Sequence, residues 1–454
     1  MVAALIIAAN ILGLAQNGKA VIEERNVRSA MGFLASDAMQ GRGSGTIFER
    51  IAAEYIGSQF MQFGLEPAGE PGWDGKPSYV QTAVSNRRDF VGNPTLKIGS
   101  TTLEHGKAML VIRAGADILS GHLQKITLGD KPNSGAAVFV KMPAAAPQNP
   151  MQALQGVAAA GASIIIIEET AQYRAGWERS ASRTLSYAVP AAPAKPSVMI
   201  VVDKASAEVL NGLADGTVVD FAGVPGQVQQ TWNAIGKITG TDTAAGEVIL
   251  LSSHLDHVGV NQAAPGDDKI FNGADDDASG SVAVVELARM LAGGKKPKRT
   301  VYFVCFGSEE RGGAGATYFV NNLPFPKEKL VANLEFEMIG RPDAKVKPEE
   351  LWLTGYERSN LGPELAKRGA KLVQDPHPDQ NFFQRSDNYT LARQGIIAHT
   401  VSSFGLHTDY HKASDEIKTI DFSHMTRSIN SMVEPVQWLV NSNFVPAWNE
   451  GKKP

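Results

Sequence analysis

Residues 301–310 have the sequence Val301-Tyr302-Phe303-Val304-Cys305-Phe306-Gly307-Ser308-Glu309-Glu310. A continuous apolar run of this length, rich in β-branched and aromatic residues and followed by glycine, is typical of a strand buried on both faces of a parallel sheet. Two acids come directly after that strand. Because open α/β sheets bind their ligands beyond the carboxyl ends of the strands, Glu309 and Glu310 mark a candidate site.

The same arrangement occurs on both sides of this stretch. Further apolar runs that predict strands are Val248–Leu251, Val331–Phe336, Trp352–Thr354 and Ile396–Val401, and a helical pattern at Ser281–Leu291 follows the first of them. Strands that alternate with helices predict an α/β fold with a mostly parallel sheet. The first run leads into His254 and the second into Glu337. We therefore expect both side chains at the same sheet edge as the two acids.

These side chains are suited to binding a metal. The chain has one cysteine, Cys305, so histidines and carboxylates would have to supply the ligands, and no disulfide framework can form. Asp256 lies two residues after His254. On an extended backbone Asp256 would point to the same side and orient the imidazole.

Three more acids and one more histidine extend the candidate site. The run Asp275-Asp276-Asp277 places three carboxylates side by side, which repel one another unless a cation neutralises them. His411 follows the last of the strands that end near the site. Within the Glu309–Glu310 pair, one acid could bind metal and the other could accept a proton from the attacking water. The other histidines, including His257 and His407, are interpreted as ordinary surface or core side chains.

Composition and local sequence pattern indicate the class of partner, the localisation and the domain boundaries. A net charge of −4 over 454 residues removes the electrostatic reason to expect nucleic-acid binding. Residues 1–15 are almost wholly apolar, too short to span a bilayer, and predict a cleaved signal peptide and export to the periplasm or the medium. No later segment predicts stable membrane insertion. Residues 93–223, β-rich and interrupted by Ala/Pro segments, predict a domain of their own, inserted between residues 16–92 and 224–454.

Taken together, the motifs resemble those of the secreted co-catalytic dizinc aminopeptidases. The matching segments are His254-x-Asp256, Gly273-Ala274-Asp275-Asp276-Asp277-x-Ser279-Gly280, Ser308-Glu309-Glu310, Glu337-Met338-Ile339-Gly340 and Tyr410-His411. The glycine-rich turn Gly41-Arg42-Gly43-Ser44-Gly45 is similar to that family's N-terminal region. The middle block resembles its inserted protease-associated domain. The resemblance implies an α/β/α sandwich of the phosphorylase/hydrolase type, with residues 16–92 and 224–454 forming one peptidase domain.

The resemblance also implies a role for each motif residue. His254 and Glu337 would hold one Zn²⁺, Glu310 and His411 a second, and Asp276 would bridge the two ions. Glu309 would be the general base, Asp256 would orient His254, and Tyr410 would stabilise the oxyanion. The family commonly has Asp where this chain has Glu337, whose side chain is one methylene longer. The implied substrates are peptide or protein N-termini.

Two other functions remain open at this point. One is a glutaminyl-cyclase-like acyltransferase, which uses a related fold with a single zinc. The other is a non-catalytic, receptor-like binding protein that keeps the fold but not the chemistry. A metal count per chain separates the first from a dizinc hydrolase, and the presence of five competent ligand side chains argues against the second. Substrate preference, exopeptidase type and oligomeric state do not follow from the sequence.

Overall fold

The sheet that carries the predicted strand ends has four parallel strands at its centre. In a computed structural model, these strands lie in the order β18 (Ala398–Ser402), β15 (Leu330–Phe336), β11 (Val248–His254) and β14 (Thr300–Phe306). β16 (Leu351–Leu353) pairs antiparallel with β18 and parallel with β17 (Leu372–Gln374). On the other side, β10 (Val218–Ile238) pairs antiparallel with β14. The prediction of a mixed sheet centred on parallel strands is confirmed.

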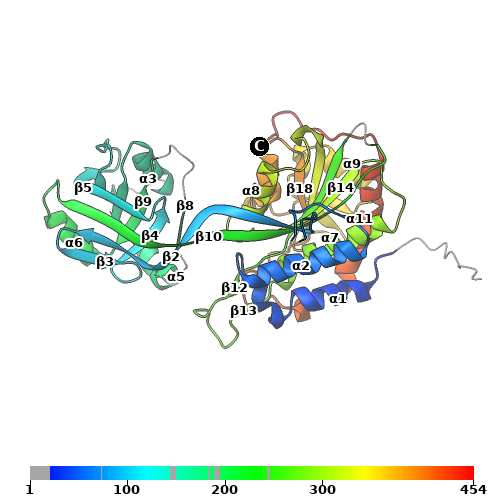
Figure 1. The fold of residues 1–454 in the computed structure, drawn as a ribbon, viewed down its shortest axis with the longest axis horizontal. Helices are drawn as coiled ribbons and strands as arrows, with labels where there is room; N and C mark the ends of the chain where they lie inside the picture. The colour runs from blue at the N-terminus through cyan, green and yellow to red at the C-terminus, as the bar shows by residue number, and fades with distance from the viewer. Residues whose placement is uncertain (1–20, 73, 144–149, 182–184, 189–194, 243–245) are drawn as a thin grey trace, which may run out of the picture.

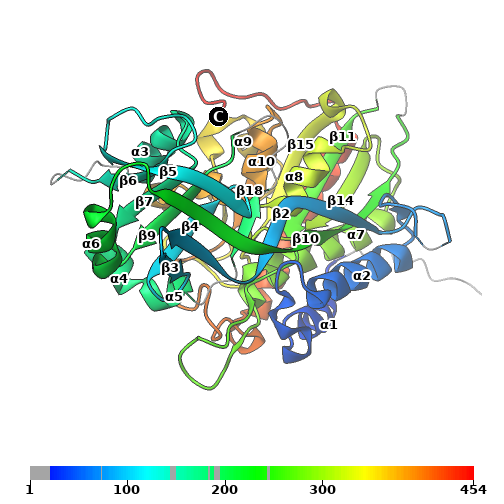
Figure 2. The same cartoon turned by 60° about the vertical axis from the view of Figure 1, so that its left-hand side comes forward.

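Helices cover both faces of this sheet (Figures 1 and 2). One face is packed by α1 (Glu24–Leu34), α2 (Ile47–Gln62), α7 (Gly280–Ala292), α9 (Leu361–Lys367) and α11 (Phe422–Asn441), and the other by α8 (Ala314–Asn321) and α10 (Asn388–Ala392). Alternate residues of one strand serve the two layers, because successive side chains of a strand point to opposite faces. In β11, Ile249 and Leu251 join the first core, and Val248 and Leu250 join the second. The sheet with helices on both faces is an α/β/α sandwich.

The N-terminal region packs against this domain. α2 begins at Ile47, where the Thr46 side chain caps the helix by accepting a hydrogen bond from the Phe48 amide at 3.3 Å. Between α1 and α2 the chain makes a tight turn at Asp37–Arg42. β1 (Glu66–Pro67) then joins the edge of β10. The glycine-rich segment predicted as a turn is one.

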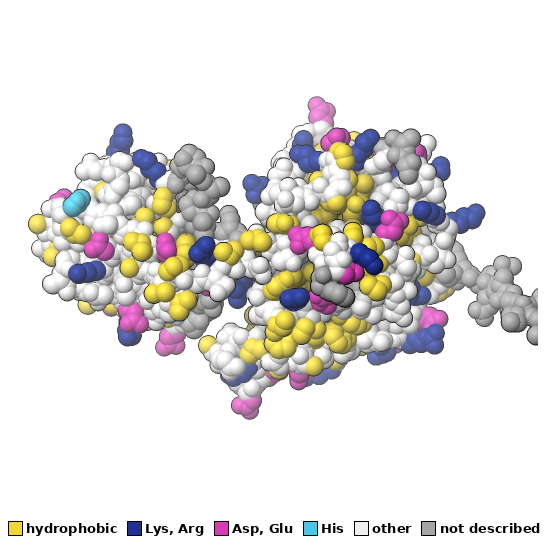
Figure 3. Space-filling view, viewed as in Figure 1, with side chains coloured by type: hydrophobic (Ala, Val, Ile, Leu, Met, Phe, Trp, Pro, Cys, Tyr) yellow, Lys and Arg dark blue, Asp and Glu magenta, His cyan; other side chains and the backbone are white. Residues whose placement is uncertain are grey.

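A long two-stranded ribbon leads away from the domain. β2 (Val80–Ile98) and β10 run antiparallel along nearly their whole lengths, with irregular pairing near the middle. The expected domain boundaries at residues 92/93 and 223/224 fall inside these two strands, so no linker separates the parts. In the space-filling view the two parts meet at a narrow waist on the face shown (Figure 3).

The far end of the ribbon carries a β-rich unit. Its strands are β3 (Thr101–Glu104), β4 (Met109–Ala114), β5 (Ile118–Thr127), β6 (Ala137–Lys141), β7 (Ile164–Glu168), β8 (Ser186–Ala188) and β9 (Val198–Val202), and its helices are α3 (Pro150–Ala159), α4 (Ala171–Ala175), α5 (Trp177–Ala181) and α6 (Lys204–Gly212). β3 to β9 pair with one another, with β2 and with residues 218–222 of β10, whereas β14 pairs with residues 234–238 of β10. Two apolar clusters form its core, and one of them includes residues of β2 and β10.

The structure describes residues 21–454 except 73, 144–149, 182–184, 189–194 and 243–245. The predicted signal peptide at residues 1–15 lies outside these. Within the described part of the chain, no helix combines the length and apolar character needed to cross a bilayer.

Candidate metal centre

The predicted side chains lie where the parallel strands end. His254 is the last residue of β11, Glu309 and Glu310 follow β14, and Glu337 follows β15. Tyr410 and His411 come from the loop after β18, and Asp276 lies in the turn Ala274–Ser279 that leads into α7. The structure brings the five predicted ligands together in two overlapping groups of donor atoms, here called the metal cavity: His254, Asp276, Glu310, Glu337 and His411.

The five side chains form two groups that share Asp276. In the first, His254 Nε2 lies 3.2 Å from Asp276 Oδ1 and 3.9 Å from Glu337 Oε1. In the second, His411 Nε2 lies 3.2 Å from Asp276 Oδ2 and 3.1 Å from Glu310 Oε2. Each oxygen of Asp276 therefore faces a different histidine. This is the arrangement that a carboxylate bridging two cations requires.

The donor atoms fit metal ions better than they fit one another. Several buried atoms of the cavity have no hydrogen-bond partner among the described residues: His254 Nε2, Asp276 Oδ2, Glu310 Oε1 and both ring nitrogens of His257. An unpaired buried polar group costs about 1–3 kcal/mol, so a cluster of them calls for a ligand. Imidazole nitrogen and carboxylate oxygen are the donors that zinc accepts.

The charges of the buried side chains also favour bound cations at the site. Burial by itself would raise the pKa of Glu310 and lower that of His411. The close pairing of Glu310 with His257 and His411 nevertheless holds the Glu310 pKa at about 2, and Asp276 and Glu310 raise the pKa of His411 to about 10. For Glu337 burial prevails and raises the pKa to about 8. Without cations, protonated histidines have to balance the buried carboxylates, and bound cations would take over that role.

Of the three adjacent aspartates, only Asp276 faces the cavity. Asp277 accepts hydrogen bonds from the amides of Gly280 at 2.9 Å, Met338 at 3.0 Å and His254 at 3.2 Å. Asp275 accepts from the Gly340 amide at 2.7 Å and lies 2.9 Å from His407 Nε2. The argument that all three carboxylates need a cation is therefore wrong for two of them, because hydrogen bonds from the surrounding fold satisfy the oxygens of Asp275 and Asp277.

The Asp256 carboxylate hydrogen-bonds residues other than His254. The nearest contact between its carboxylate and the His254 ring is 3.7 Å, and His254 Nδ1 lies closer to the Asp256 backbone oxygen, at 3.2 Å. The carboxylate itself accepts the Glu309 amide at 2.9 Å and the Ser44 hydroxyl at 2.5 Å. Asp256 thus connects the end of β11 to the turn that carries Glu309. This link could not be read from the spacing of His254 and Asp256.

Two buried residues of the N-terminal region, Arg42 and Glu49, hydrogen-bond the segments that carry the site residues. Arg42 is fully buried and donates to the backbone oxygens of four residues at 2.6–2.9 Å, namely Leu34, Leu255, Asn272 and Gly273. Glu49 of α2 accepts from the Ser308 amide at 2.7 Å and from the Thr231 hydroxyl at 2.8 Å. The Arg42 guanidinium group therefore connects the end of α1 to the residue after His254 and to the two residues before the Asp276 turn.

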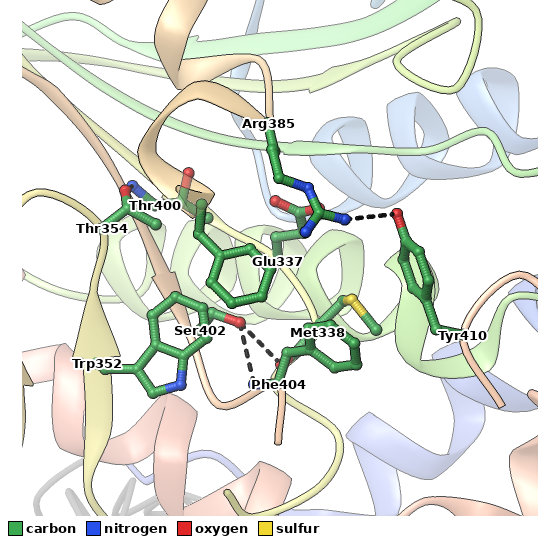
Figure 4. Close-up of a pocket in the computed structure, with 10 residues that line it drawn as sticks. Glu337, Met338, Trp352, Thr354, Arg385, Thr400, Ser402, Phe404 and Tyr410 are labelled. Carbon is green, nitrogen blue, oxygen red and sulfur yellow. Dashed lines mark hydrogen bonds between the residues drawn. The ribbon is translucent and has the colours of Figure 1, made fainter. Parts of the chain in front are cut away.

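A pocket opens beside the metal cavity (Figure 4). Its walls are Glu337, Met338, Trp352, Thr354, Phe382, Arg385, Thr400, Ser402, Phe404 and Tyr410. The Tyr410 ring stacks on His411 with centroids 3.9 Å apart, and its hydroxyl accepts a 3.5 Å hydrogen bond from Arg385 Nη2. Burial, together with Asp276 and Glu310, raises the pKa of Tyr410. The hydroxyl is therefore neutral and available as a hydrogen-bond donor.

His257 is the residue that sequence reasoning missed. Interpreted as an ordinary imidazole, it instead lies with Nδ1 2.8 Å from Glu310 Oε1 and 3.8 Å from Asp276 Oδ2. It joins Asp276, Glu310 and His411 in a cluster whose donor atoms all lie within 4.8 Å of one another. The signal available in the sequence was its position next to Asp256 in His254-Leu255-Asp256-His257.

The sequence is similar to those of known peptidases. Over 214 residues the chain is 33% identical to leupeptin-inactivating enzyme 1 of Streptomyces exfoliatus, which covers 44% of this chain and 47% of that protein. Over 97 residues it is 38% identical to an aminopeptidase of Pseudomonas aeruginosa, covering 21% of this chain and 16% of the relative. The chain spans less than half the length of these curated relatives.

Solved structures share the fold. The aminopeptidase from Aneurinibacillus sp. strain AM-1 superposes with a TM-score of 0.57 at 17% identity, over 93% of this chain and 95% of that one. A zinc aminopeptidase from Bacillus subtilis gives 0.55 at 18% identity, over 93% and 97%. Residues 233–435, which contain every side chain of the two donor groups, match the model of peptidase family M28. The segment that holds the candidate metal centre is therefore similar to peptidase family M28.

Proposed function

We propose that this protein is a zinc-dependent aminopeptidase that removes N-terminal residues from peptides. The observation that supports this most is the pair of donor groups that share Asp276, set beside a side-chain pocket. His254, Asp276 and Glu337 would hold one ion, and Asp276, Glu310 and His411 a second. Two such ions would polarise the scissile carbonyl and acidify the attacking water.

Glu309 is the proposed general base. It is partly buried beside the cavity, and its amide is fixed by Asp256, yet it belongs to neither donor group. Its carboxylate is therefore free to take the proton of the attacking water and to pass it to the leaving amine. Glu310, one residue later, lies against His257 and His411 and has its oxygens committed to the donor group.

The pocket and Tyr410 would position the substrate. The apolar walls Trp352, Phe382 and Phe404 suit the side chain of the first residue. Tyr410, held by Arg385 and by stacking on His411, can direct its hydroxyl hydrogen to the oxygen that becomes negative during attack. We also propose that residues 1–15 direct export of the protein and that residues 93–223 form a protease-associated domain.

The experiment exchanges the two acids one at a time. Glu309→Gln should keep its zinc and lower kcat at least about 100-fold, the lower end for losing a general base. Glu310→Gln should lose zinc together with activity. Exposed Glu328→Gln provides the control for a lost carboxylate elsewhere. Zinc content per chain and turnover of an aminoacyl chromogenic substrate are the measurements.

Four results would count against the proposal. A Glu309→Gln protein that loses its metal, or that retains near-native turnover, would contradict the division of roles. Equal hydrolysis of a free and an N-acetylated substrate would contradict aminopeptidase action. A wild-type metal content of one ion per chain would favour the cyclase-like alternative instead.

A further inference from the structure

The His257 ring is held rigidly at the wall of the metal cavity. The residue is fully buried, and its amide donates to the Arg42 backbone oxygen at 3.2 Å. On the other side of the ring, a Cβ atom built on Gly273 would come within 2.4–2.5 Å of the His257 ring atoms Cγ and Cδ2. Gly273 also has a φ of +56°, which favours glycine. The backbone therefore packs directly against this imidazole and fixes where its nitrogens point.

The contacts of the ring resemble those of the proposed ligand histidines. His257 Nδ1 lies 2.8 Å from Glu310 Oε1, yet neither atom has a hydrogen-bond partner among the described residues. His254 Nε2 behaves in the same way toward Asp276 Oδ1, at 3.2 Å. A ring nitrogen and a carboxylate oxygen that share one cation sit in this manner, since each directs its lone pair at the ion and not at the other.

We propose that His257 is a fourth protein ligand of the ion held by Asp276, Glu310 and His411. The two metal positions are then unequal. Four protein donors match the ligand count of structural zinc sites, whereas the three donors His254, Asp276 and Glu337 match that of catalytic sites, which keep a position for water. The four-donor position holds its ion more tightly, and the three-donor position exchanges its ion more readily. The inference rests on the proposed function only in requiring cations at this site.

The alternative role for His257 is a hydrogen bond that positions Glu310. His257→Asn separates the two roles, because the asparagine Nδ2 can occupy nearly the place of the histidine Nδ1 and still donate to Glu310, while removing the imidazole ligand. His257→Ala removes both. His424→Ala deletes a buried imidazole of α11 that hydrogen-bonds Ser403 and Ser428, and it controls for the loss of a buried ring.

The test is a cobalt(II) titration of the metal-free proteins, followed by visible absorption and by metal analysis. The wild type and His424→Ala should bind two ions, one tightly and one weakly. In both His257 variants the tight step should weaken by more than about 100-fold, beyond the 10–100-fold expected for an outer hydrogen-bond partner. The absorption band of the tightly bound ion should also change, since it loses a nitrogen ligand.

Two outcomes would overturn the inference: an unchanged cobalt band in His257→Asn, or a wild type whose two ions bind equally. Metal binding is measured without turnover, so failure of the proposed function is a separate result. A wild type that binds two unequal ions but hydrolyses no aminoacyl substrate would reject the peptidase proposal and leave the role of His257 standing.

Discussion

Acid should destabilise this protein through one buried histidine of the central sheet. His399 lies on β18 with Nδ1 2.7 Å from the Thr354 backbone oxygen and Nε2 2.7 Å from the Ser359 hydroxyl. A carbonyl oxygen can only accept, so Nδ1 carries the hydrogen and Nε2 accepts from Ser359. This hydrogen bonding requires a neutral ring. Burial lowers the pKa of His399 to about 4.

The sign and size of the effect follow from that pKa. The folded value of about 4 lies below the unfolded value of 6.5, so His399 adds no pH dependence above pH 6.5. As the pH falls from 6.5 toward 4, the unfolded chain takes up a proton that the folded chain refuses, and stability is lost. At about 1.4 kcal/mol per pKa unit, the loss attributable to His399 at pH 4.5 is about 2.5 kcal/mol.

The assay compares the wild type with His399→Asn at pH 7.5 and pH 4.5. Asparagine can still donate to Thr354 but cannot ionise. Urea unfolding can be followed by tryptophan fluorescence, because Trp448 lies against the His399 ring with centroids 5.6 Å apart. The variant should be about 1–3 kcal/mol less stable at pH 7.5, where the Ser359 hydroxyl loses its partner. Its further loss on going to pH 4.5 should be about 2.5 kcal/mol smaller than that of the wild type.

The comparison cancels every other titrating group, including those of the metal centre, because both proteins contain them. Equal losses of stability between pH 7.5 and pH 4.5 would refute the reasoning, since they would mean that the folded protein accepts a proton on His399 as readily as the unfolded chain does.

Two further predictions concern the supports of the metal cavity. Arg42→Met should lower the free energy of unfolding by several kcal/mol, because it leaves four buried backbone oxygens without their donor at about 1–3 kcal/mol each. Urea unfolding would measure this, and a change below about 1 kcal/mol would contradict it. Asp415→Asn should weaken metal binding about 10–100-fold, since Asp415 Oδ2 accepts the amides of Asp275 and Asp276 and Oδ1 accepts Arg341 Nη2, so the NH₂ group of asparagine would have to face a donor. A metal titration that matches the wild type would show that the carboxylate is dispensable.

The sequence by itself determined the frame of the site. Buried parallel strands are recognisable because their apolar runs are continuous, and the residues that follow them must gather at one sheet edge. That local rule was enough to expect His254, Glu310 and Glu337 together, and the order of motifs brought in Asp276 and His411. The α/β/α layers follow from the same runs, since a strand buried on both faces needs helices on both.

Only the tertiary structure decided which neighbours face the cavity. Asp275, Asp276 and Asp277 are chemically equal in sequence. The turn before α7 directs Asp276 to the cavity, while the amides of Met338 and Gly340, which follow β15, bind the other two. His257 lies next to the predicted site in sequence, but its role could not be derived from that position. Its role depends on Glu310, which is 53 positions away and is brought close by the β11–β14 pairing. Hydrophobic pattern fixes where a strand ends, but the direction of each side chain beyond that end is set by turn geometry and by contacts far along the chain.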